Sequence, residues 1–121
     1  MTEEKFCEEI LNYLLNIKLN VLIYDFKTIP MPNSEMVETQ DYFFTTNNLG
    51  VCHLYICNTH NKQGISYRAT LLIKTKKQKK AELNFKNTNA KLIKLVEKLK
   101  SLCSIIENDY DNIIEEINNA S

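Results

Sequence analysis

The sequence predicts an α+β fold in which two helices cover one face of an antiparallel sheet, and three observations predict it. Residues 66–86 alternate apolar and polar side chains on both sides of a lysine cluster, which is the pattern of a β-hairpin. Residues 3–17 carry apolar side chains at three- and four-residue spacing, so they predict an amphipathic helix. A second apolar stripe of helical spacing follows the hairpin. Because each such helix needs a surface to cover, we expect both to pack on the sheet.

The composition fits one domain that spans residues 1–121. Of the 121 residues, 44% are hydrophobic, which suffices for a core. No apolar run of about 18 residues and no basic-then-apolar leader is present, so we expect a cytoplasmic protein that binds no membrane. The cysteines lack the spacing of a disulfide framework, and we expect reduced, mostly buried thiols. They are Cys7, Cys52, Cys57 and Cys103.

The charge is segregated along the chain, although the net charge is zero. From Lys62 to Lys100 there are twelve Lys or Arg against two Glu, a balance of +10. Residues 1–61 and residues 101–121 each have a balance of −5. Phosphate binding depends on local potential more than on net charge, so a basic face for RNA or DNA remains a candidate.

The first half of the chain predicts a helix, a strand, a loop and a strand. Thr2 is the expected N-cap of a helix over 3–17, whose apolar stripe runs through Phe6, Ile10, Leu14 and Ile17. A strand over 20–27 should end before the prolines at 30 and 32, because proline cannot donate to a ladder. Residues 31–50 have a poor periodic signal and predict a long loop, either without regular structure or with one short strand. A strand over 51–57 follows.

The basic hairpin consists of strands over 65–74 and 81–86. On the first strand Ile65, Tyr67, Ala69, Leu71 and Ile73 face the core, and on the second Ala81, Leu83 and Phe85 do so. The opposite face carries Arg68, Thr70 and Lys74, beside the tip lysines Lys76, Lys77, Lys79 and Lys80. This cationic face indicates a polyanion site. The alternative is that edge lysines only keep the hairpin soluble and prevent association between sheet edges.

The last segment predicts one long helix over 88–118. Its heptad stripe comprises Leu92, Val96, Leu99, Cys103, Ile106, Tyr110, Ile113 and Ile117. A helix of about 30 residues spans roughly 45 Å, more than a small four-stranded sheet can cover. We therefore expect its acidic far end to contact a partner helix or the first helix. The isolated chain should accordingly form a homodimer if its natural partner is missing.

The sequence offers little for catalysis. Two glycines exclude a glycine-rich phosphate loop, and the paired glutamates lie at adjacent helical positions that diverge. The cluster of Cys52, His53, Cys57 and His60 matches no common zinc spacing, since the two cysteines point to opposite faces of a strand. We expect no enzyme activity, no cofactor and no metal.

Three passages resemble the family of the fourteen-kilodalton subunit of the signal recognition particle. EKFCEEILNYLLNIKLNVLIYDFK is similar to the opening helix and first strand of that family. Thr28, Pro30 and Pro32 fit its Thr-x-Pro-x-Pro segment, and LLIKTKKQKKAELNFKNTNAKLIKLVEKLKSL resembles its strand, lysine-rich turn, strand and second helix. The resemblance covers about residues 3–32 and 70–103. It implies an αβββα-type Alu-binding fold, here with one extra strand.

The resemblance also implies a function and partners. The chain would pair with the nine-kilodalton subunit, bind the Alu domain of the particle RNA and, through the ribosome, contribute to elongation arrest during protein targeting. Lys79 and Lys80 fall on lysines of the family's turn. Charge and strand parity add Arg68, Lys74, Lys76, Lys77 and Lys86, with Lys27 a weaker addition, as RNA contacts.

Three departures and one alternative accompany the resemblance. Asn33, Ser34 and Glu35 replace a basic, glycine-rich loop, residues 33–65 are longer than the family pattern, and an acidic end replaces its basic tail. The alternative function is a protein-interaction module that dimerises or docks through the C-terminal helix, with solubilising lysines. A weaker alternative is a nucleic-acid-binding protein unrelated to the particle.

Overall fold

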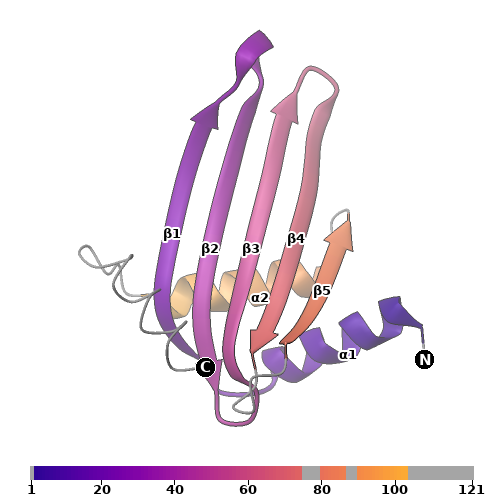
Figure 1. Ribbon diagram of the computed structural model, residues 1–121, viewed down its shortest axis with the longest axis vertical. Coiled ribbons are helices and arrows are strands. Elements are labelled where there is room, and N and C mark those ends of the chain that lie inside the picture. The colour runs from indigo at the N-terminus through magenta and orange to yellow at the C-terminus, as the bar shows by residue number, and fades with distance from the viewer. Residues whose placement is uncertain (1, 75–79, 87–89, 104–121) are drawn as a thin grey trace.

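The fold is α+β, with two helices on one face of a five-stranded antiparallel sheet. The computed structural model describes residues 2–74, 80–86 and 90–103 (Figure 1). The strands form a meander in the order β1-β2-β3-β4-β5, so each strand pairs with its neighbour in the sequence. The class, the antiparallel sheet and its two helices are as the sequence predicts. The sheet has one strand more than the four expected.

Helix α1 (Glu3–Leu15) begins and ends with identifiable caps. The Thr2 hydroxyl accepts a hydrogen bond from the Lys5 amide at 3.2 Å, which makes Thr2 the N-cap, as predicted. The helix ends two residues before the expected boundary, with Asn16 as its C-cap. Its buried side chains are Cys7, Leu11 and Leu14. Phe6, expected in the stripe, is 42% exposed because the buried stripe is centred one residue further along the chain.

Strand β1 (Asn20–Pro30) is longer than predicted, because its proline lies where proline is tolerated. Pro30 pairs with Met36, although the prolines were expected to end the strand near residue 27. The explanation is that β1 is an edge strand, so the missing N–H of Pro30 need not remove a ladder bond. The Met31 amide donates to the Glu35 carbonyl at 2.9 Å and closes the following turn.

The prediction of a long loop over residues 31–50 is wrong. This segment contains a short 3₁₀ turn, η1 (Pro32–Ser34), in which Asn33 has a φ of 66°, and then the full strand β2 (Met36–Thr46). Strand β2 pairs along its whole length with β1 on one side and β3 on the other. The sequence signal is weak because Glu38, Gln40 and Asp41 interrupt the apolar alternation of this interior strand.

The remaining strands form the predicted hairpin and bury most of its predicted face, although Ala81, expected in the core, is exposed at the start of the last strand. They are β3 (Gly50–Asn61), β4 (Gly64–Lys74) and β5 (Lys80–Lys86). Ala69, Leu71, Ile73, Leu83 and Phe85 are buried, which confirms the strand parity. Ile65, expected in the core, is 67% exposed because it lies at the end of the sheet that the helices do not reach.

Helix α2 (Ala90–Leu102) completes the helical layer and buries Leu92, Leu95 and Leu99. It ends at Leu102, so Cys103 lies outside the helix that was expected to continue to residue 118. The rest of that expected helix lies outside the described residues. Within the described part of the chain, no helix is long and apolar enough to cross a membrane.

The helices cover only part of the sheet. Strands β1 to β4 have 11 or 12 residues and therefore a length of roughly 36 Å, whereas each helix has 13 residues and a length of about 20 Å. Figure 1 shows both helices crossing the lower half of the strands. We call the uncovered end, with residues 26–39 and 57–68, the projecting half of the sheet.

Candidate nucleic-acid interface

The face of the sheet turned away from α1 and α2, here called the open face, carries the basic residues that the sequence singles out. Cross-strand partners share a face, so the pairing of the strands defines rows of side chains across it. The first row is Lys27, Thr39, Cys57 and Arg68. The second row is Asp25, Asp41, Tyr55, Thr70 and Asn84. The third row is Ile23, Phe43, His53, Leu72 and Glu82. The fourth row is Thr45, Val51, Lys74 and Lys80.

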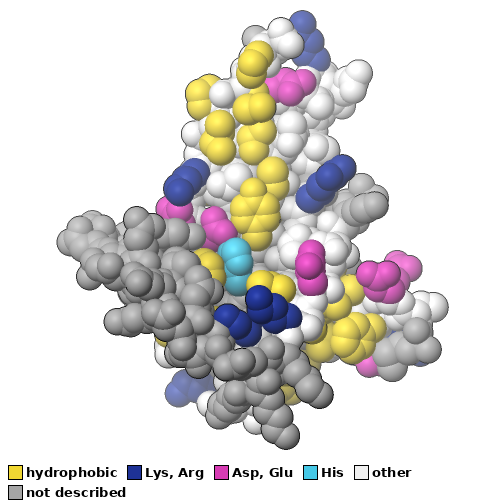
Figure 2. Space-filling model, viewed as in Figure 1, with side chains coloured by type: hydrophobic (Ala, Val, Ile, Leu, Met, Phe, Trp, Pro, Cys, Tyr) yellow, Lys and Arg dark blue, Asp and Glu magenta, His cyan; other side chains and the backbone are white. Residues whose placement is uncertain are grey.

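Strand parity places the predicted basic residues of β4 and β5 on this one face. Arg68 and Lys80 are exposed, and Lys74 is half-buried. Lys74 is paired with Lys80, while the backbone of Lys86 is paired with Arg68. The predicted contacts Lys76, Lys77 and Lys79 lie outside the described residues. Figure 2 shows Lys and Arg side chains on both sides of a column of hydrophobic side chains that follows the strands.

These cations form two groups, one at each end of the β4–β5 ladder. Arg68 and Lys74 are separated by six residues along one strand, which corresponds to about 20 Å. Arg68 and Lys27 lie in the same row but three strand spacings apart, about 14 Å. The sugar-phosphate backbone of a nucleic acid that crosses the open face would thus meet positive charge near the edges of the sheet, on β1, β4 and β5.

The acidic residues of the open face are largely paired. Asp25 lies 3.3 Å from the Lys27 ammonium, so Lys27 supplies less net charge than its exposure suggests. The Asp41 carboxylate lies 2.7 Å from His53 Nε2. Glu82 on β5 is exposed. Within the described residues, Arg68, Lys74 and Lys80 form no ion pair.

An aromatic cluster that was not predicted from the sequence lies at the centre of this face. The Phe43 and His53 rings are stacked, with centroids 4.0 Å apart and planes at 8°. Tyr55 and His53 form a T-shaped pair, with centroids 6.4 Å apart. Strand parity over 51–57 was a sufficient signal, because it puts His53, Tyr55 and Cys57 on one face.

The cysteines are free thiols, and β3 separates them as predicted. Cys52 is buried on the helix side, where burial raises its pKa to about 12, whereas Cys57 is half-buried on the open face. The two histidines also lie on opposite faces, His60 being 3.3 Å from Glu38 on the helix side. Within the described part of the chain, no group of three metal-ligating side chains comes together.

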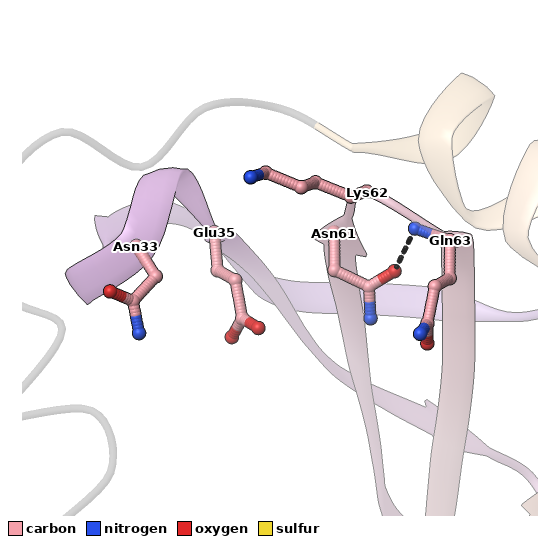
Figure 3. A pocket seen from close by; sticks show the side chains of 5 residues that line it. All are labelled: Asn33, Glu35, Asn61, Lys62 and Gln63. Carbon is pink, nitrogen blue, oxygen red and sulfur yellow. Dashed lines mark hydrogen bonds between the residues drawn. The ribbon is translucent and has the colours of Figure 1, made fainter.

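A polar pocket of about 260 Å³ lies at the far tip of the projecting half. Figure 3 shows Asn33 and Glu35 on one side of it, facing the β3–β4 turn with Asn61, Lys62 and Gln63. The Gln63 amide donates to the Asn61 side chain at 2.9 Å, which stabilises the turn. All five lining residues are exposed, so the pocket contains no buried polar group aimed at a ligand.

Comparison with family models, with curated proteins and with solved structures finds no match to this chain.

Proposed function

We propose that this chain is an RNA-binding protein that acts as a subunit of the Alu domain of the signal recognition particle and binds the particle RNA through its open face. One observation supports RNA binding above the others. Arg68, Lys74 and Lys80 share a sheet face that neither helix covers, and none of them has an ion-pair partner among the described residues. Such side chains bind phosphates without reading sequence.

The assignment to the particle comes from the sequence resemblance. An αβββα-type Alu-binding fold would be extended here by two strands, since the sheet has five. Pairing with the nine-kilodalton subunit, contact with the ribosome and a contribution to elongation arrest belong to the same proposal. A non-enzymatic role also belongs to it.

A second candidate is a protein-interaction module. It is favoured by the apolar side chains of the projecting half, where Phe26 is 48%, Met36 37% and Ile65 67% exposed. Exposed apolar side chains gathered at one end of a sheet are typical of surfaces that bind another protein.

A salt titration tests RNA binding. The variant carries Arg68→Gln, Lys74→Gln and Lys80→Gln, and its matched control carries Lys5→Gln, Lys94→Gln and Lys100→Gln on the helical layer. Each lost phosphate contact should reduce the slope of log affinity against log salt by about 0.7 to 0.9. We expect a slope smaller by about 2 to 3 for the open-face variant and an unchanged slope for the control. A flat wild-type titration, or equal slopes for both variants, would contradict RNA binding by this face.

Copurification tests membership of the particle. The tagged chain, isolated from its own cells, should bring down a small RNA and a second small protein. Treatment with ribonuclease should remove the RNA and leave the protein pair intact. Recovery of a protein partner without any RNA would favour the interaction module instead.

A further inference from the structure

We propose that Tyr55 is a stacking site for an unpaired nucleobase, so that the open face takes single-stranded RNA rather than a duplex. This inference rests on the proposed RNA-binding function and deepens it. Tyr55 lies on β3, the central strand of the sheet, and it is 36% exposed. Phe43, another aromatic side chain on this face, is only 9% exposed. Tyr55 therefore offers a ring to a ligand where Phe43 does not.

The surroundings of Tyr55 hold the ring in place before any ligand arrives. The Asp41 carboxylate lies 2.7 Å from His53 Nε2, and the Phe43 ring stacks on the imidazole with ring centroids 4.0 Å apart. His53 in turn packs against Tyr55 in a T-shaped arrangement, with the planes at 63°. A ring mounted on a strand and supported in this way loses little conformational freedom when a base stacks on it, which favours binding.

The neighbouring rows supply what a nucleotide needs besides a stacking partner. Arg68 lies in the first row, diagonal to Tyr55, and its side chain is exposed. It can therefore reach a phosphate of the RNA strand whose base stacks on Tyr55. Thr70 and Asn84 lie in the row of Tyr55 itself, and the Thr70 hydroxyl donates to the Asn84 side-chain oxygen at 2.9 Å. Polar groups beside the ring can therefore meet the edge of a stacked base.

The chemistry of the ring suits an anionic ligand. Burial, with a further contribution from Cys57 and Asp41, raises the pKa of the Tyr55 hydroxyl, so the side chain stays a neutral phenol at physiological pH. Every base has a π face, so stacking here tolerates many sequences. The paired bases of an A-form helix are not accessible to such a ring, whereas splayed single-stranded bases are.

The test compares a single-stranded RNA of about twelve nucleotides with an abasic oligomer of the same length and charge. Tyr55→Ala should weaken binding of the RNA about tenfold, and Tyr55→Phe should leave it unchanged. Neither variant should alter the affinity for the abasic oligomer. The salt slope of Tyr55→Ala should equal that of the wild type, because stacking releases no counterions. The matched control is Phe26→Ala, which removes an exposed aromatic ring on the helix side and should not change RNA affinity.

The outcomes separate the two proposals. If the wild type binds neither oligomer at low salt, RNA binding is refuted, and base stacking falls with it. If the wild type binds both oligomers equally, or if Tyr55→Ala binds RNA as tightly as the wild type, stacking is refuted while phosphate binding by the open face stands. Thermal unfolding of Tyr55→Ala, measured on the same sample, shows whether weaker binding reflects lost folding. Loss of binding to the abasic oligomer as well would assign Tyr55 a structural role and overturn the inference.

Discussion

At the scale of single residues, Cys52 shows how burial controls chemistry in this sheet. Its side chain is fully buried against the helical layer, and the loss of solvation raises its pKa from 9.0 to about 12. Burial also raises the pKa of Cys7, Cys103 and Tyr24. Each of these groups therefore loses its proton at a lower pH in the unfolded chain than in the folded one, so the free energy of unfolding falls at alkaline pH.

We expect the free energy of unfolding to be constant below about pH 9 with respect to Cys52 and to fall above it. The unfolded thiol loses its proton near 9.0 while the folded thiol keeps it until about 12, so the loss is about 1.4 kcal/mol per pH unit for this group. Urea unfolding between pH 8 and pH 11 measures it. Cys52→Ala should show a shallower decline. Ile56→Val, a comparable core change on the same strand without a titrating group, should parallel the wild type; parallel profiles for all three proteins would contradict the assignment.

At the scale of secondary-structure elements, Lys98 joins the two helices. Its ammonium donates to the carbonyls of Leu14 and Leu15, both at 3.0 Å, and to the carbonyl of Ile17. The first two lie at the C-terminal end of α1, where carbonyls lack helical partners and the helix dipole favours a cation. One side chain of α2 thus satisfies the end of α1 and fixes the angle at which the chain enters β1.

Lys98→Met should destabilise the protein by about 2 kcal/mol, because it keeps the apolar stem and removes a charged donor from partly buried carbonyls. Lys94→Met is the matched control, since Lys94 is exposed on the same helix and its loss should cost less than about 0.5 kcal/mol. The measurement is the urea midpoint at pH 7 with an unchanged denaturant slope. Similar midpoints for the two variants would mean that these hydrogen bonds contribute no net stability.

The elements also show which parts of the fold can be predicted from sequence. The β4–β5 hairpin was predictable because one of its faces is buried and the other wet, so alternation marks both strands. Strand β2 was not, because the polar Gln40 is buried on the helix side of the sheet, and Phe43 is buried on the opposite face from Tyr42 and Phe44. The basic residues of the candidate site could be predicted from the alternation of side chains along β4 and β5. The aromatic side needed the register of β2 against β3, which brings Phe43 onto His53.

At the scale of the whole molecule, the strands are longer than the helices that cover them, and this divides the sheet into a packed half and a projecting half. In the packed half, Tyr42, Leu54 and Leu71 lie in one row and are fully buried. In the projecting half, the row of Met36 ends at Ile65, which is 67% exposed. The same ladder therefore continues from a region with a core into one without it.

Amide hydrogen exchange should resolve this division. Strands β2 and β3 are interior strands, so their amides are hydrogen-bonded along the whole ladder, and the two halves differ in packing rather than in bonding. Local opening of the projecting half exposes little apolar surface and should need less free energy than global unfolding. We expect residues 57–61 of β3 to exchange faster than residues 52–56 of the same strand. Equal protection along β3 would show that the projecting half is as stable as the core. A second measurement at high dilution would then reveal whether self-association supplies that protection, because an interface between copies of the chain is lost on dilution.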